Sequence, residues 1–563
     1  MLQLLPALAL LLVGCVDQST PSEDEVESDE PEALVLSVDT GQDRHAISPL
    51  IYGVNPFGGY DCADADVRYG ACRLGGNRWT AYGWETNLSN AGRDWCYQND
   101  EHLLGAWRAE HPDEPDEAPP PGAAATYLLD QAGSVGAAAM LTVPIVDYVA
   151  SSVPDTRCTC PAPDDDSCTP DVRHQPGVDD HLGTYFDQNR STKDGELSTT
   201  PDLEDGVVYQ DEFVALVREQ AQDTQVIFSL DNEPDLWHST HPEVHPEQVG
   251  YQELVDRNVD YATAIRSVWP EAEISGFASY GYWGYVSLGG RAPDGDGQGP
   301  FLDFYLQQMQ RAEQRADTRL IDYVDLHWYP EIQVEDENGE EHRLTENEVF
   351  DEMVEARVQA PRSLWDGSYS ENSSIASVAG GAIELIPWVQ QKIDDYYPGT
   401  KIAITEWHYG AGGHISGGVA VAAVLGVFGR EGVGLATLWP HAYSEAYVEA
   451  AFRVYRNYDG EGASFGDTSV RATSSDDALA AVFASVDSTD HERIAVVAIN
   501  RSAEPQDCTL QLEHASGFST AEVFTLTDET SDLLPGDLLR ATDPNVFEYP
   551  MPGHSVSVIV PQS

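Results

Sequence analysis

The sequence predicts an α/β fold, a TIM-like (β/α)8 barrel followed by a C-terminal β-sandwich domain. Three observations support this prediction. From about Cys72 to Pro440, short apolar β-rich runs alternate with longer segments of helical character, which is the pattern of a parallel sheet. Polar or aromatic residues gather at the C-terminal ends of those runs, where barrel proteins place their active sites. After about Phe465 the β-rich runs continue without helices between them, which is typical of a sandwich.

The first 33 residues precede this folded body. Residues 1–14 form an apolar run that is too short to span a bilayer and reads as a lipoprotein signal peptide. Leu12 to Cys15 resembles the bacterial lipobox, which implies that Cys15 is the lipid-modified cysteine. Residues 15–33 carry many carboxylates and few apolar side chains, so we expect a disordered tether. The expected location is extracytoplasmic, lipid-anchored to the bacterial envelope or cell surface, with membrane contact through the lipid alone.

The body itself divides into three predicted parts. Residues 34–50 contain a β-rich run that we expect to join the sandwich, residues 51–464 form the barrel, and residues 465–563 form the sandwich. The clearest barrel strands are predicted at 138–146, 225–234, 272–279, 323–330, 401–410 and 434–440. Residues 252–269 and 299–316 have apolar side chains mostly at three- and four-residue spacing, which predicts helices between the strands.

Composition restricts the class of ligand. The chain has 29 Lys and Arg residues against 96 Asp and Glu residues, a formal net charge of −67. A surface of this charge repels phosphate backbones and anionic lipids, so we expect no nucleic-acid partner. A neutral substrate fits this charge best.

The cysteines indicate an oxidising compartment. Seven occur besides Cys15, several of them close together in loop-like sequence, as in local disulfides. Cys158, Cys160 and Cys168 offer zinc binding as a rival interpretation, although the Cys-x-Cys spacing is tighter than in usual zinc sites. Residues 154–182, rich in Asp and Cys, look like an insertion that could lengthen or close one end of a cleft.

Two glutamates have equivalent positions at the ends of predicted strands. Glu233 follows the run that ends in SLDNEP, and Glu406 lies in AITEWHYG. A barrel would bring both carboxylates to its C-terminal rim, where one could protonate a glycosidic oxygen while the other attacks the sugar or activates water. Four tryptophans near the same strand ends offer indole faces for stacking on sugar rings: Trp237, Trp328, Trp407 and Trp439.

Several separate segments resemble glycoside hydrolase family 44, a family of endoglucanases and xyloglucanases. The resemblance covers nearly everything after the tether, and its motifs occur in the expected order. These motifs are RLGGNRWTAYGWETNLSNAGRDW (73–95), SLDNEPDLWHSTHPEVHPE (229–247), DLHWYPE (325–331), ARVQAPRSLWD (356–366), YYPGTKIAITEWHYGAGGHISGG (396–418) and YRNYDGEGASFGDTSV (455–470).

The resemblance implies a retaining endo-β-1,4-glucanase that acts on soluble or amorphous cellulose, on xyloglucan, or on both. By matched motif, Glu233 resembles the acid/base and Glu406 the nucleophile that forms a covalent glycosyl-enzyme. Asn232 is similar to the residue that contacts the sugar 2-hydroxyl, and Trp439 resembles the platform beneath the sugar at the cleavage point. The other expected substrate-binding or supporting residues are Arg73, Asn77, His327, Trp328 and Tyr329. No cofactor is implied for catalysis, but a structural Ca²⁺ is compatible with the family and with the acidic stretch 201–206.

Three alternatives stay open at this point. His238, His241 and His245 could hold a metal, although Pro242 interrupts their helix and the spacing is not that of H-E-x-x-H. The cleft could belong to a non-catalytic surface protein that binds glucan. A closer alternative is an endo-acting hydrolase of another β-linked glycan, such as xylan, mannan or lichenan. Oligomeric state and disulfide pairing do not follow from the sequence.

Overall fold

A computed structural model describes most of the chain after the tether. The described residues are 33–57, 60–95, 97–112, 118–151, 182–290, 292–440 and 445–563. Residues Leu34–Ser563 form one compact unit. The predicted signal peptide, Cys15 and nearly all of the tether lie outside the described residues, as do Cys158, Cys160, Cys168 and almost all of the 154–182 segment.

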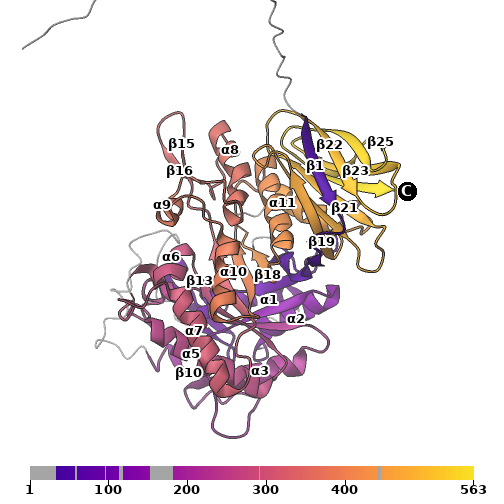
Figure 1. Cartoon of the computed structure of the whole chain (residues 1–563). Coiled ribbons are helices and arrows are strands. Elements are labelled where there is room, and N and C mark those ends of the chain that lie inside the picture. Colours follow the sequence, from indigo (N-terminus) through magenta and orange to yellow (C-terminus); the bar gives the residue numbers. More distant parts are fainter. Residues whose placement is uncertain are drawn as a thin grey trace, which may run out of the picture. The chain divides into compact units, whose positions relative to one another are not determined.

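Eight parallel strands close into a barrel, which confirms the predicted fold class (Figure 1). In spatial order the strands are β12 (Val226–Leu230), β13 (Glu273–Ser279), β14 (Tyr323–Trp328), β17 (Lys401–Trp407), β18 (Leu435–Leu438), β3 (Gly53–Val54), β4 (Ala71–Leu74) and β8 (Ala138–Val143). Most of these strands are buried along their whole length, as expected when helices cover a parallel sheet. Because the strands are parallel and close into a barrel, their C-terminal ends open together at one rim.

Twelve α-helices are described, and those predicted at 252–269 and 299–316 are α5 and α7. Their bounds are α1 (Gly105–Glu110), α2 (Ala123–Val135), α3 (Gln210–Gln220), α4 (Trp237–Thr240), α5 (Tyr251–Val268), α6 (Tyr282–Ser287), α7 (Phe301–Ala316), α8 (Asp351–Gln359), α9 (Ser374–Ala379), α10 (Leu385–Tyr396), α11 (Ile415–Arg430) and α12 (Ala446–Arg456). No helix in the described part of the chain combines the length and apolar character needed to cross a membrane.

Helix α11 joins the barrel to the C-terminal β-domain. Every residue from Ile415 to Gly429 is buried, because α11 contacts α8 and α12 on the barrel side and β20 and β27 of the β-domain. Gly426 allows the close approach, since a Cβ there would lie 2.3 Å from the Phe483 ring. A larger residue would separate the two parts.

The C-terminal β-domain is one hydrogen-bonded sheet that includes the first described strand of the chain. That strand, β1 (Leu34–Asp39), pairs in parallel with β22 and antiparallel with β19 (Figure 1). The other strands are β2 (His45–Ala46), β19 (Thr468–Ser474), β20 (Ala480–Val486), β21 (Ile494–Asn500), β22 (Gln506–Glu513), β23 (Thr520–Thr527), β24 (Thr530–Pro535), β25 (Leu539–Asp543), β26 (Val546–Met551) and β27 (Ser555–Gln562). Burial alternates along β22, whereas β20 and β21 are buried on both faces because one face packs on the barrel.

Three small sheets lie in the connections between barrel strands. They are formed by β5 (Tyr82–Gly83), β6 (Leu88–Asn90) and β7 (Asn99–Asp100), by β9 (Tyr148–Ala150), β10 (Phe186–Arg190) and β11 (Val207–Tyr209), and by β15 (Gln333–Glu335) and β16 (Glu341–Arg343). One disulfide, Cys62–Cys72, ties the loop after β3 to β4. Cys508 is buried and unpaired among the described residues.

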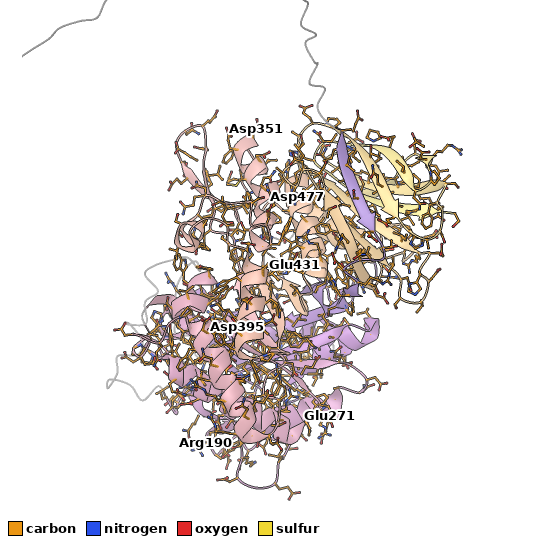
Figure 2. The ribbon with its side chains drawn as sticks, in the orientation of Figure 1. Arg190, Glu271, Asp351, Asp395, Glu431 and Asp477 are labelled. Atoms are coloured by element: carbon orange, nitrogen blue, oxygen red, sulfur yellow. A yellow bond between two sulfur atoms is a disulfide. The ribbon has the colours of Figure 1, made fainter. Side chains whose placement is uncertain are left out.

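The acidic side chains explain how a chain of this charge still folds. Glu271, Asp351 and Asp395 are examples that lie exposed on the surface, where water screens their mutual repulsion (Figure 2). Several buried carboxylates, among them Asp231, Asp325 and Glu406, accept hydrogen bonds from specific donors. Those at the barrel rim are described next.

Candidate functional site

Glu233 and Glu406 stand at the same end of the barrel. Glu233 follows β12, the fourth barrel strand in chain order, and Glu406 lies near the end of β17, the seventh. The backbone of Glu233 is left-handed, with φ 46° and ψ 54°, and its N–H donates to the Ala278 carbonyl at 2.8 Å. A left-handed conformation is costly for a non-glycine residue and often marks a functional position.

His327, on the sixth barrel strand β14, lies between the two carboxylates. Its Nδ1 is 2.9 Å from Glu233 Oε1 and 3.5 Å from Glu406 Oε2. One oxygen of each carboxylate and a ring nitrogen of His327 all lie within 4.8 Å of one another. The barrel thus brings two glutamates that are distant in sequence into direct opposition.

Arg73 links Glu406, the nucleophile candidate, to Asn55 and Asn232 through hydrogen bonds. This side chain is 1% exposed, and its Nη1 donates to Glu406 Oε1 at 2.9 Å and to Asn55 Oδ1 at 3.1 Å. Its Nη2 donates to Asn232 Oδ1 at 2.7 Å, and the Gly76 N–H donates to the same oxygen at 3.0 Å. With its Oδ1 occupied in this way, the amide nitrogen is the group that Asn232 has left to offer a ligand.

Tyr329 supplies the second contact to Glu406. The Tyr329 hydroxyl donates to Glu406 Oε2 at 3.0 Å, while Arg73 contacts Oε1, so each oxygen of Glu406 accepts a hydrogen bond from a different donor. Both contacts suit a carboxylate that accepts hydrogen bonds and does not donate them. Glu406, 5% exposed, is held in one orientation.

Burial gives Glu233 a different protonation behaviour. It raises the pKa of Glu233 to about 7, an effect that the charge of Arg73 opposes and that of Asp94 supports. Burial also lowers the pKa of His327 to about 4, so this ring is neutral at neutral pH. Because its Nδ1 faces two carboxylates, the neutral tautomer with Nδ1–H fits the contacts. The site therefore combines Glu233, a carboxyl that can keep its proton near neutral pH, with Glu406, a carboxylate that two hydrogen-bond donors hold in place.

Trp439 lies at the edge of this site, after β18. A Cβ on Gly76, whose φ is 86°, would come within 2.5 Å of the Trp439 ring, so glycine is needed for this approach. The Phe57 ring lies 4.5 Å from the Trp439 ring, centroid to centroid. Trp439, Phe57 and Arg73 border an open pocket of about 620 Å³. Among the four tryptophans considered for stacking, Trp439 is therefore the one that borders this pocket.

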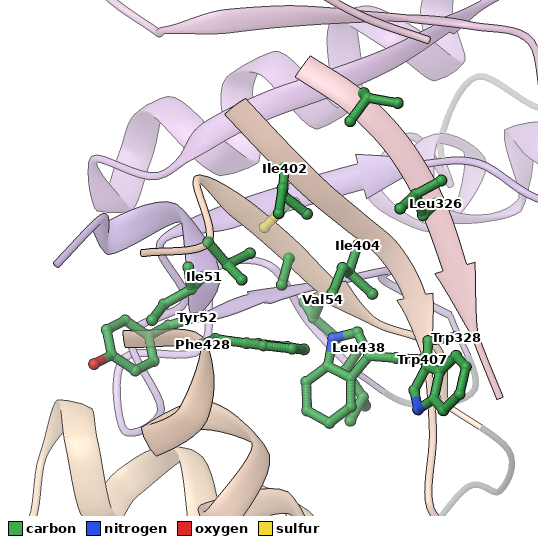
Figure 3. Packing of buried hydrophobic residues seen from close by; sticks show 14 of the residues in the cluster. Ile51, Tyr52, Val54, Leu326, Trp328, Ile402, Ile404, Trp407, Phe428 and Leu438 are labelled. Carbon is green, nitrogen blue, oxygen red and sulfur yellow. The ribbon is translucent and has the colours of Figure 1, made fainter. Parts of the chain in front are cut away.

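The structure corrects the expectation for Trp328, Trp237 and Trp407. Each is at most 1% exposed, and Figure 3 shows Trp328 and Trp407 among the apolar side chains of the core. The reason is strand alternation: Trp328 and Trp407 directly follow His327 and Glu406, so they point away from the site. Trp328 donates instead to the Tyr409 hydroxyl at 3.2 Å. A buried indole has no free face for a sugar.

Asn77 borders the same pocket as Arg73 and Trp439, and its hydrogen bonds go to neighbouring loops. Its side chain donates to the Ala91 carbonyl at 3.3 Å, and its own carbonyl lies 2.8 Å from His241 Nε2. His245 Nε2 lies 3.0 Å from Glu253 Oε1. Within the described ranges, His238, His241 and His245 form no group that could share one metal ion. These residues brace the loops around the site.

Two residues that sequence reasoning did not single out also belong to the site. Asn55, directly after β3, accepts from Arg73 and donates to the Thr405 carbonyl at 3.0 Å. Asp94 borders the pocket and contributes to the raised pKa of Glu233. The sequence could have indicated Asn55, because it follows a short apolar run at the point where a barrel strand should end. Nothing in the sequence indicated Asp94 except its place in a matched motif.

Comparison with known proteins points to one family. The family model described as glycoside hydrolase family 44 matches residues 88–332. The chain is 36% identical over 539 residues to endoglucanase A of Paenibacillus lautus, covering 94% of this chain and 72% of that protein. It is 34% identical to the β-mannanase/endoglucanase A of Caldicellulosiruptor saccharolyticus, covering 93% of this chain but only 39% of that longer protein.

A solved structure shows the same likeness across the whole fold. The family 44 xyloglucanase of Paenibacillus polymyxa, solved with xyloglucan, is 35% identical with a TM-score of 0.84. The alignment covers 94% of this chain and 100% of that one.

Proposed function

Because this chain belongs to glycoside hydrolase family 44, we propose that it is a retaining endo-β-1,4-glucanase acting on soluble or amorphous cellulose, on xyloglucan, or on both. The proximity of the carboxylates is the observation that supports retention most directly. Oxygens of Glu233 and Glu406 lie within 4.8 Å of each other. Retaining enzymes have carboxyl groups about 5–5.5 Å apart, whereas inverting enzymes leave about 6.5–9.5 Å for a water molecule.

In the first step, Glu406 attacks the anomeric carbon while Glu233 donates its proton to the departing glycosidic oxygen. Arg73 and Tyr329 hold the two oxygens of Glu406, so one lone pair is aimed before the substrate arrives. The raised pKa of Glu233 keeps its proton available near neutrality. The bond to the leaving sugar breaks, and a glycosyl ester forms on Glu406.

In the second step, water releases the sugar from Glu406. Glu233, now ionised, takes a proton from the attacking water, and the ester bond to Glu406 breaks. His327 Nδ1–H donates to Glu233 and so stabilises its charge at this stage. We infer that the amide nitrogen of Asn232, whose Oδ1 accepts from Arg73 and Gly76, contacts the sugar 2-hydroxyl, as the family resemblance implies. Two inversions at the same carbon restore the β configuration.

The names of the relatives support a β-1,4-glucan substrate. Two of them are endoglucanases, and a third is a xyloglucanase solved with xyloglucan. A second candidate is an endo-acting hydrolase of another β-linked glycan. The name β-mannanase/endoglucanase A favours mannan within this second candidate, although the chain spans only 39% of that relative.

The stereochemistry of the first product tests the proposal. We expect the protein to release reducing ends from carboxymethyl cellulose and from xyloglucan, and proton NMR to show the β-anomer before mutarotation. Appearance of the α-anomer first would contradict retention. A folded protein that hydrolyses neither polymer would contradict the glucanase assignment, and a parallel assay on mannan would test the second candidate.

We also propose that the fold can hold a structural Ca²⁺, as the acidic stretch 201–206 indicates. No ligand set is assigned, because Glu85, Asp187, Asp205 and Glu212 are not among the described groups whose oxygens lie close enough to share one ion. Asp205 is exposed, and Glu212 is already paired with Lys193 at 2.6 Å. Calcium would stabilise the fold and take no part in the reaction.

Thermal unfolding tests this proposal. We expect the Tm of the wild type to be higher with added Ca²⁺ than with a chelator. An equal Tm under both conditions would contradict a structural Ca²⁺.

Finally, we propose that the protein is anchored to the bacterial envelope through a lipid on Cys15. This proposal rests on the lipobox-like residues 12–15 and on the acidic stretch that follows them.

A further inference from the structure

Glu445 is a buried carboxylate to which the proposed reaction gives no role. It directly precedes helix α12 and is 2% exposed. Its Oε1 lies 2.8 Å from His408 Nε2, and its Oε2 accepts a hydrogen bond from the Tyr60 hydroxyl at 2.9 Å. A buried carboxyl group is costly unless hydrogen bonds compensate for the lost water, and these two contacts do so. Glu445 therefore joins two segments that are distant in sequence.

The protons of this cluster follow from its hydrogen bonds. The Gly410 N–H donates to His408 Nδ1 at 2.9 Å, so Nδ1 is an acceptor and the ring proton lies on Nε2, facing Glu445. Burial, followed by the charge of Glu445, raises the pKa of Tyr60, so its hydroxyl keeps its proton and donates. Glu445 thus accepts from both neighbours, which suits an ionised carboxylate.

The His408 contact leads to the nucleophile candidate through strand β17. Glu406 lies near the end of this strand, and His408 follows two positions later with its ring fully buried. The segment after β17 leaves room for Glu445 because residue 412 is glycine: a Cβ there would lie 2.6 Å from the Cβ of Glu445. The hydrogen bond from His408 therefore holds the chain in place two residues beyond the reacting carboxylate.

The Tyr60 contact leads to the partner of that carboxylate. Tyr60 lies in the loop between β3 and β4, and the Cys62–Cys72 disulfide closes this loop directly before Arg73. Arg73 in turn donates to Glu406 Oε1 at 2.9 Å. The loop that the Tyr60 hydrogen bond holds is thus the one that leads into the residue orienting the nucleophile.

We propose that Glu445 is a positioning residue for Glu406, the nucleophile in the proposed function on which this inference rests. Glu445 holds the end of β17 and the loop before β4 together, so Glu406 and Arg73 meet in one geometry. Because Glu445 is buried, its effect passes through His408 and Tyr60. A nucleophile must approach to about 3–3.5 Å, and a misplacement of about 1 Å can cost about 10²-fold in rate. Loss of Glu445 should therefore slow the formation of the glycosyl ester without removing the nucleophile.

Trapping the glycosyl-enzyme tests this role. The probe is a dinitrophenyl β-cellobioside with fluorine in place of the sugar 2-hydroxyl. Glu406 forms an ester bond to its anomeric carbon while the bond to the phenol oxygen breaks and dinitrophenolate leaves. Fluorine destabilises the positively charged transition state of the second step, so the ester persists and mass spectrometry counts the labelled fraction. We expect Glu445→Ala to lower the labelling rate at least tenfold, while the protein still becomes fully labelled on Glu406.

The labelled fraction and the labelling rate separate positioning from damage to the fold. A purely structural role would lower the labelled fraction and leave the rate unchanged, and this result would overturn the proposal. The control is Asp487→Ala in the β-domain, which removes a carboxylate that accepts from Arg493 at 2.9 Å. This control should lower the Tm but not the labelling rate.

The conservative variant Glu445→Gln tests the two hydrogen bonds. Its side-chain oxygen can accept from His408 while its amide donates to the Tyr60 oxygen, so we expect a labelling rate within threefold of the wild type. A rate as low as that of Glu445→Ala would contradict positioning through these hydrogen bonds.

A further variant keeps the test valid if Glu445→Ala does not fold. Tyr60→Phe removes one donor and keeps the ring, and we expect it to lower the labelling rate at least threefold with full labelling. A wild-type rate in Tyr60→Phe would then overturn the proposal. The wild type separates this inference from the proposed function: no labelling of Glu406 in the wild type contradicts the proposed function, whereas normal labelling in every variant contradicts only the role of Glu445.

Discussion

Replacing Glu406 with glutamine is expected to lower kcat on β-glucan by at least about 10⁴-fold, because the amide cannot form the glycosyl ester. The expected loss is large because no other carboxylate could replace Glu406 as the nucleophile. Among the described residues, Glu406 alone accepts hydrogen bonds from both Arg73 and Tyr329. Glutamine keeps the shape of the side chain, so the fold should persist. Steady-state hydrolysis of carboxymethyl cellulose and xyloglucan, together with a thermal melt, checks this prediction.

Chemical rescue distinguishes loss of the nucleophile from general damage. In Glu406→Gly, azide should occupy the space of the missing carboxylate and attack an activated β-glycoside from that side, giving the α-glycosyl azide. The control is Glu271→Gln, which changes an exposed glutamate that is distant in sequence from Glu406. This variant should retain the wild-type kcat. Wild-type activity in Glu406→Gln, or a β-glycosyl azide from Glu406→Gly, would contradict the assignment of the nucleophile.

Replacing Glu233 with glutamine should produce a loss that depends on the leaving group. General acid catalysis contributes about 10²–10⁴-fold, so hydrolysis of polymer should fall by that factor. Aryl β-cellobiosides with acidic phenols need little proton donation, so the rate of forming the glycosyl-enzyme from them should change far less. Their intermediate should then accumulate, because Glu233 is also the base for the second step. Pre-steady-state release of the phenol measures both effects.

The same variant tests the protonation state of Glu233. The acid must carry its proton, and burial raises its pKa to about 7, so wild-type kcat/KM should fall as the pH rises through about 7. In Glu233→Gln this alkaline limb should disappear, because glutamine does not titrate. Persistence of the limb in the variant would assign it to another group. Loss that is equal for polymer and for activated aryl glycosides would exclude Glu233 as the acid.

Much of the barrel could be predicted from the sequence because its signals are local. The predicted runs at 138–146, 272–279 and 323–330 correspond to β8, β13 and β14, and the strand ends differ by only a few residues. Each run is a short stretch of apolar residues between polar segments, which is all that a buried parallel strand requires. The rim positions of Glu233 and Glu406 followed once the barrel was assumed, since all strand ends open on one face.

The tryptophans show where such local reasoning stops. Four of them lie near strand ends, yet only Trp439 borders the pocket while Trp328 and Trp407 pack in the core. The alternation of side chains along a strand could have predicted the outward direction of Trp328, given that His327 points inward. It could not predict Trp439, which lies after the last residue of β18 and is placed by its contacts with Gly76 and Phe57.

The sequence by itself determined the fold class, six of the barrel strands, two of the helices, the family resemblance and the two candidate glutamates, because these depend on residue type and spacing along the chain. Only the tertiary structure decided that Arg73 and Tyr329 hold Glu406, that burial raises the pKa of Glu233, and that Trp439 borders an open pocket. The physical reason is distance in sequence. Arg73 and Glu406 are separated by 333 positions, and the strength of a hydrogen bond or of desolvation depends on the neighbours that the closed barrel brings together.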